Sequence, residues 1–205
     1  MDKLNLHPQI LQKLRQQTNP QNNSYTFLAF SLNLETADLT DKLNTNLTEW
    51  HLKLLSTLLD HYTQGKPTPL KGKLVKYKDI PGGHAYEGAF DKRAIQPVAK
   101  FFGEKPAELM QAARLLGGVE RSFGDASFEV ETLKGIPLTY ILWGAEEFPA
   151  TASILYDESA SSYLPTEDLA VLGELTTSRL IQAKHSDVNL KVQLPHVVSY
   201  KLEVF

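Results

Sequence analysis

Residues 126–157 constrain the fold most, because they alternate between apolar and polar like strands and are divided by short turns. The stretch "SFEVETL" places every second side chain on one face, as a half-buried strand does. The stretch "IPLTYILWG" is almost entirely apolar, which is typical of a central strand. Lys134 and Gly135 supply a turn between them, and "SILYD" at 153–157 follows as a third strand. The pattern predicts an antiparallel β-meander.

Helical patterns precede and follow this meander. Residues 8–17 predict a short helix, and from 47 to 62 apolar side chains recur every three or four positions, as on one face of a helix. Another helix is expected between Pro106 and Gly117, because proline suits a first turn and glycine a helix end. Thr166, followed by two acidic residues, is expected to cap a last helix. The sequence therefore predicts an α+β fold, a β-meander packed with helices and preceded by a short helical N-terminal part.

One segment rich in glycine and proline divides the chain. "TQGKPTPLKGK" at 63–73 is expected to link an N-terminal helical part, 1–62, to an α+β core, 74–205. The two parts are predicted to form one compact domain.

Further strands and one irregular helix are expected outside the meander. Residues 25–30 and 74–77 predict short strands, and 188–205 predicts an added terminal strand or hairpin. Asp91 is a good helix cap, but Pro97 requires a kink or a later start of that helix.

The composition excludes several classes of protein. The chain has no cysteine, which excludes disulfides, thiolate metal sites, iron–sulfur ligation and cysteine nucleophiles. Its net charge of −3, without a basic block, argues against a nucleic-acid surface. The first ten residues have no apolar core like that of a signal peptide, and no apolar run is long enough for a membrane span. These features predict a cytoplasmic protein that binds neither nucleic acid nor membrane.

The stretch "IPGGHAYEGAF" at 80–90 is the first candidate site. Gly82 and Gly83 permit positive φ and a close approach of the backbone to a ligand. His84 and Tyr86 are expected to line a flat pocket, with His84 as a possible axial ligand of a tetrapyrrole metal. The competing interpretation is a structural turn whose rings pack on the core.

The second set of candidates lies at strand ends. Asp125, Glu147 and Asp157 are carboxylates suited to acid–base chemistry, or, in the competing interpretation, to capping and turns. Trp143 ends the most apolar strand and is predicted to be a core residue, with stacking on a ring-shaped ligand as the alternative. The serines at 159–162 have no base near them in the sequence.

Several spaced motifs lie between residues 50 and 182. They are Pro81-Gly82-Gly83, Gly117-Gly118, Gly124-Asp125, Leu142-Trp143-Gly144, Glu147-Phe148-Pro149, Asp157 and Tyr163-Leu164-Pro165-Thr166-Glu167. With these motifs the sequence resembles the DUF3786 family, a domain of unknown function. The resemblance implies no activity, since none is established for the family. Its members occur alongside iron–sulfur or corrinoid-dependent proteins, which implies a partner of that kind. Some members carry a cysteine-rich segment, which this chain lacks entirely.

The leading hypothesis is a binding or accessory module for a small molecule or a tetrapyrrole or corrinoid ligand, with no cofactor assigned and no metal site. The pocket is expected between the 80–90 loop and the strand ends near Asp125 and Trp143. The alternatives are a carboxylate-dependent hydrolase or lyase, and a purely structural interaction domain. The predicted ligand-binding residues are Gly82, Gly83, His84, Tyr86, Asp125, Trp143, Glu147 and Asp157.

Overall fold

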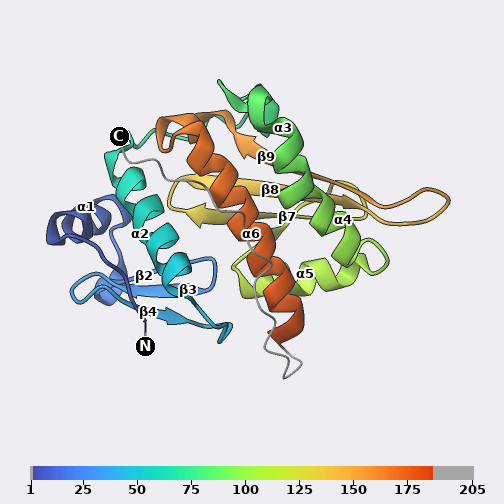
Figure 1. Cartoon of the computed structure of the whole chain (residues 1–205). Coiled ribbons are helices and arrows are strands. Elements are labelled where there is room, and N and C mark those ends of the chain that lie inside the picture. The colour runs from blue at the N-terminus through green and yellow to red at the C-terminus, as the bar shows by residue number, and fades with distance from the viewer. Residues whose placement is uncertain (1, 187–205) are drawn as a thin grey trace.

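The computed structural model describes residues 2–186, which form two antiparallel sheets and a set of helices packed against them (Figure 1). This arrangement confirms the predicted α+β fold. The strand or hairpin predicted at 188–205 lies outside the described residues.

The predicted β-meander is confirmed and forms the centre of a five-stranded sheet. Gly135 adopts φ 81° in the turn between the first two meander strands, a conformation that glycine tolerates best. The predicted strand at 74–77 adds one edge, and a short strand that the sequence did not reveal adds the other. In spatial order the sheet contains β5 (Leu74–Lys76), β9 (Thr151–Asp157), β8 (Ile136–Trp143), β7 (Ala126–Leu133) and β6 (Val119–Glu120).

The N-terminal part contains a four-stranded sheet in addition to its predicted helices. The run predicted as one strand at 25–30 is a hairpin, because Leu28 and Ala29 take φ of 45° and 62° and reverse the chain. The prediction of a single strand was therefore wrong. In spatial order the sheet contains β1 (Asp2–Lys3), β4 (Asp38–Asp41), β3 (Phe30–Asn33) and β2 (Ser24–Phe27).

The predicted helices are present with small changes of boundary. A π-helical segment, Asp91–Ile95, joins α3 to α4, so Asp91 lies within a continuous helical path instead of capping it. Pro97 directly follows this segment, as the second residue of α4. The helices are α1 (Pro8–Thr18), α2 (Glu49–Gln64), α3 (Glu87–Phe90), α4 (Gln96–Phe102), α5 (Pro106–Leu115) and α6 (Thr166–Ser186).

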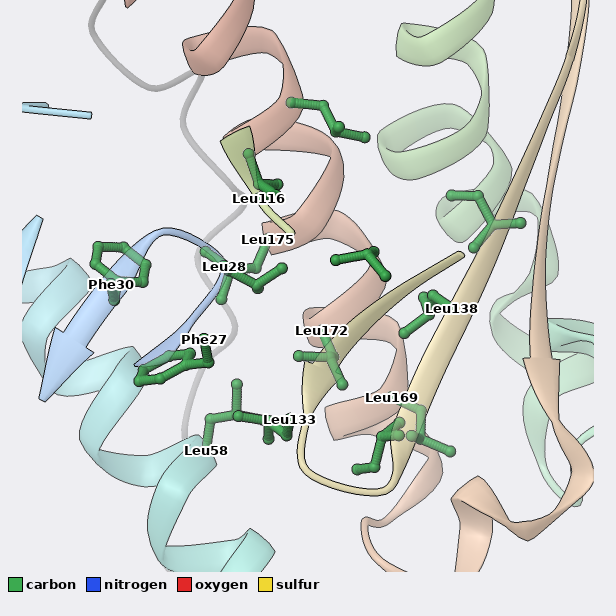
Figure 2. Packing of buried hydrophobic residues seen from close by; sticks show 14 of the residues in the cluster. Phe27, Leu28, Phe30, Leu58, Leu116, Leu133, Leu138, Leu169, Leu172 and Leu175 are labelled. Carbon is green, nitrogen blue, oxygen red and sulfur yellow. The ribbon is translucent and has the colours of Figure 1, made fainter. Parts of the chain in front are cut away.

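Helix α6 runs through the middle of the molecule and is buried on all sides from Leu169 to Ala183. Figure 1 shows it crossing the five-stranded sheet between α2 and α4. Its leucines meet Phe27 and Leu28 of the N-terminal hairpin on one side and Leu138 of β8 on the other (Figure 2). One continuous apolar core therefore joins the two sheets through α6.

Arg179 is a charged side chain inside this core and is only 1% exposed. Its two Nη atoms donate to the carboxylate oxygens of Asp41 at 2.5 and 3.1 Å. Its Nε donates to the carbonyl of Leu28 at 3.0 Å, and its guanidinium lies 4.0 Å from the ring centroid of Phe30. All three partners belong to the N-terminal part, so this one side chain ties α6 to the N-terminal sheet.

Candidate functional site

An open groove of about 490 Å³ lies where the end of α2 meets the segment that leads into α6. His61, Gln64 and Gly65 line it from α2, and residues 161–165 line it from the other side. The latter begin in the short 3-10 helix η5 (Glu158–Ser162). The volume lies in the range of ordinary small-molecule sites.

The groove contains a histidine paired with a shielded carboxylate. His61 Nδ1 lies 2.6 Å from Asp168 Oδ2, across 107 positions of sequence. The His61 side chain is 39% exposed and the Asp168 side chain only 16%, so the imidazole contacts solvent while the carboxylate supports it from behind. When Asp168 is ionised and the imidazole is neutral, Nδ1 donates the hydrogen bond and Nε2 is an acceptor, because an ionised carboxylate only accepts hydrogen bonds. This is the arrangement of a general base and its positioning residue.

Burial raises the pKa of Asp168 above its ordinary value, and the hydrogen bond from His61 opposes that rise. The neighbouring carboxylate of Glu167 raises the pKa of Asp168 further.

The glycine loop borders this groove without lining it. Thr166 Oγ1 donates to the carbonyl of Pro81 at 2.7 Å, which places the loop beside Pro165 at the groove wall. The expected positive φ is found at Gly82, at 85°. At Gly83 a Cβ would overlap the carbonyl oxygen of Tyr77, so that glycine is required for close packing.

We expect Gly83→Ala to lower the free energy of unfolding by about 1–3 kcal/mol, because the added methyl forces the Tyr77 carbonyl to move. Urea denaturation measures the change. Gly88→Ala is the matched control, since a Cβ at Gly88 has no neighbour within 4 Å and lies in a helix. Equal stabilities of the two variants would contradict the tight packing of Gly83.

Tyr86 and His84 have different surroundings. The Tyr86 hydroxyl donates to Glu174 Oε1 at 3.3 Å and accepts a short hydrogen bond from Arg93. Tyr86 thus points at a buried carboxylate of α6, a contact that no local pattern of residues predicted. His84 is 88% exposed and lies 3.4 Å from Glu87, on the surface of the loop. The rings of Tyr77, Phe90 and Tyr156 pack on one another.

Asp157 holds the linker onto the end of β9. Its Oδ1 accepts from Ser159 N, Ser159 Oγ and Lys71 N, and its Oδ2 accepts from Gly72 N at 2.7 Å. Burial alone would raise the pKa of Asp157, but these hydrogen bonds outweigh it and keep the pKa below its usual value. The hydrogen bonds fix the end of the linker beside η5.

Protonation of Asp157 and Asp41 at low pH is expected to lower the free energy of unfolding. Burial would also raise the pKa of Asp41, but the hydrogen bonds and charge of Arg179 lower it. A carboxylate with a lowered folded-state pKa stabilises the protein above its unfolded pKa, about 3.9, and loses that contribution as pH falls through the folded value. We therefore expect the free energy of unfolding to fall steadily below about pH 4. Urea titrations across that range test this, and Asp157→Asn should give a shallower dependence; parallel curves would contradict the role of Asp157.

Asp125, Trp143 and Glu147 lie at the opposite end of the five-stranded sheet. Trp143 pairs with Thr151, six positions before Asp157 along β9, a separation of about 20 Å. Gly144 N donates to Asp125 Oδ2 at 2.7 Å, and Glu147 is exposed in the β8–β9 loop, which extends away from α3 in Figure 1. The predicted site residues therefore form two groups, and the single pocket expected between the glycine loop and Trp143 was wrong.

The prediction of Trp143 as a core residue was also wrong, because its side chain is 42% exposed. It is the last residue of β8, and the other residues of that strand are all buried. Phe123 and Phe148 are exposed in the loops of the same sheet end, Phe148 at 78%.

Within residues 2–186, no three His, Asp or Glu side chains come together as a metal site. No helix in that part of the chain is long and apolar enough to cross a membrane.

The comparisons with known proteins identify the family. A family model described as a domain of unknown function, DUF3786, matches residues 9–179. The chain belongs to the DUF3786 family. The match extends well before residue 50, where the resemblance in the sequence motifs began, so the DUF3786 unit includes strands β2, β3 and β4 of the N-terminal sheet and most of α6. No curated protein and no solved structure matches the chain.

Proposed function

We propose that this DUF3786 protein is a cytoplasmic binding or accessory module and that its small-molecule site is the groove at His61. One observation carries the proposal: a groove of about 490 Å³ has a histidine in its wall whose Nδ1 is held by a shielded carboxylate. The orientation of the ring is fixed before a ligand arrives, which lowers the entropic cost of binding. Polar groups of residues 161–165 supply further contacts.

In this proposal, the predicted ligand-binding residues near the groove support its wall. Gly82, Gly83, His84 and Tyr86 belong to the loop that Thr166 fastens beside the groove wall. Asp157 holds η5, which carries part of that wall. A ligand longer than the groove would extend over the loop toward His84.

Ligand binding is tested by adding small polar molecules, hydroxocobalamin and haem in turn to the ¹⁵N-labelled chain and following its amide resonances. We expect a polar compound to shift the amides of Gln64, Ser161 and Tyr163, and His61→Ala to weaken that binding. His185→Ala is the control histidine, near the end of α6. Resonance changes confined to the end of the sheet near Trp143 would contradict the His61 groove and favour a tetrapyrrole site there.

We also propose that the group at the far sheet end contacts a partner protein, of the iron–sulfur or corrinoid-dependent kind implied by the family. Phe148, Trp143 and Phe123 expose large apolar surfaces beside Asp125 and Glu147. Aromatic side chains with this exposure are typical anchors of protein interfaces.

The partner is tested with a photoreactive amino acid at position 148 in the native host. We expect crosslinks to one iron–sulfur or corrinoid-dependent protein, and their loss when Trp143→Ala is added. A photoreactive residue at exposed Lys13, on α1 of the N-terminal part, is the control. The same crosslinks from both positions would contradict a specific interface.

A further inference from the structure

We infer that the groove at His61 is a serine hydrolase site for small carboxylic esters, with Ser162 as the nucleophile, His61 as the general base and Asp168 as the positioning residue. This inference rests on the proposed function, because the ester must bind in the same groove. It assigns a reaction to residues that the sequence alone did not bring together.

The three side chains come from three separate segments that meet around the groove. His61 lies in the last turn of α2, Asp168 in the first turn of α6, and Ser162 at the end of η5. The carbonyl of Ser162 accepts a hydrogen bond from Lys66 N at 2.8 Å. This bond ties the serine backbone to the residues immediately after α2, and so to the element that carries His61.

Ser162 is a better candidate than Ser161 or Ser159. Ser159 is buried, and its hydroxyl donates to Asp157 at 2.6 Å. Ser161 and Ser162 both line the groove, but Ser161 is exposed whereas Ser162 is half-buried. Within the described residues the Ser162 hydroxyl makes no hydrogen bond. The hydrogen bond between a nucleophile and its general base often forms only when the substrate is bound.

The chemistry follows from the His61–Asp168 pair. With Nδ1–H donated to Asp168, Nε2 of His61 accepts the proton of Ser162 as Oγ attacks the ester carbonyl carbon. The Oγ–C bond forms, the bond from carbon to the alkoxy oxygen breaks, and the imidazolium returns its proton to the departing alcohol. Water, deprotonated by the same Nε2, then cleaves the acyl-serine to release the carboxylic acid and restore Ser162. No oxidant, reductant or cofactor is required.

The groove favours a small ester as the substrate. It is open, and its volume of about 490 Å³ accommodates a short acyl group and its alcohol. Helix α6 begins at Thr166, directly after Pro165 of the groove wall, so the positive end of its dipole lies beside the site. That partial positive charge stabilises the negative oxygen that develops on the carbonyl.

The test is to label the full-length protein with a fluorophosphonate probe, map the modified peptide by mass spectrometry, and follow p-nitrophenyl acetate hydrolysis. We expect a single label on Ser162, lost in Ser162→Ala and retained in Ser122→Ala, which changes an exposed serine far from the groove in sequence. His61→Gln should slow labelling by about 100-fold or more, the usual effect of losing a general base. The labelling rate of the unmodified chain should rise with pH, because a general base acts only in its deprotonated form.

Asp168→Asn should slow labelling and change its pH dependence, and Asp168→Glu should restore part of the rate, which a purely structural residue would not produce. Circular dichroism checks that each variant folds; if His61→Gln does not, the mapped serine and the pH profile of the unmodified chain decide. No label, a label on another serine, or a rate unaffected by His61→Gln would overturn the inference. Polar compounds that shift the groove resonances without any label at Ser162 would overturn the hydrolase alone and leave the binding module standing.

Discussion

Arg179→Ala is expected to lower the free energy of unfolding by about 3–5 kcal/mol, because it leaves the shielded carboxylate of Asp41 charged and without its counter-ion. The same change removes the donor to the Leu28 carbonyl and the cation that lies over Phe30. These contacts all join α6 to the N-terminal sheet, so removing them should destabilise the whole core. Urea denaturation followed by circular dichroism measures it.

Arg15→Ala is the matched control for Arg179. Arg15 lies 3.8 Å from Glu35, with both side chains well exposed, and pairs of that kind contribute at most about 1 kcal/mol. Arg179→Met combined with Asp41→Leu separates charge from packing, since replacing both partners of a buried pair with apolar residues is often nearly neutral. If Arg179→Ala were as mild as Arg15→Ala, the buried pair would not hold the two parts together.

Leu142→Ala is expected to cost about 2–5 kcal/mol, the range found when a fully buried leucine leaves a cavity. Leu142 sits in the middle strand of the five-stranded sheet, paired with Ala126 of β7 and Ala152 of β9. Small residues on both sides cannot close the space that the missing methyl groups leave. The same urea experiment measures this loss.

Leu70→Ala is the control for Leu142, because Leu70 is 54% exposed in the linker and its loss should change the free energy of unfolding by less than about 0.5 kcal/mol. A loss below about 0.5 kcal/mol for Leu142→Ala itself would show that the side chain is not part of the core.

The meander was predictable from sequence because an alternating strand, a glycine turn and an apolar strand are all local signals. The hairpin at residues 24–33 was not, since Leu28 and Ala29 adopt positive φ without being glycine or asparagine. In the sequence, two short strands joined by such residues resemble a single strand, here the one predicted at 25–30. The first sheet was missed for that reason.

The candidate site was less predictable than the fold. The contact between His61 and Asp168 spans 107 positions, and no local pattern links the end of one helix to the start of another. The eight predicted residues were selected as glycines, rings and acids near turns, and such residues gather at both ends of a sheet. Only the strand register reveals that Asp157 and Trp143 lie at opposite ends.

The contacts of Arg179 also bear on the order in which the chain emerges from the ribosome. The hairpin that carries Phe27, Leu28 and Phe30 is synthesised about 150 residues before the guanidinium that bonds to Leu28. At a synthesis rate of about 5–20 residues per second, that interval lasts roughly 8–30 s. During it the apolar face of the first sheet has no α6 to cover it. The nascent chain therefore passes through a stage in which this apolar face is uncovered, and its folding is completed only when its last described helix has been made.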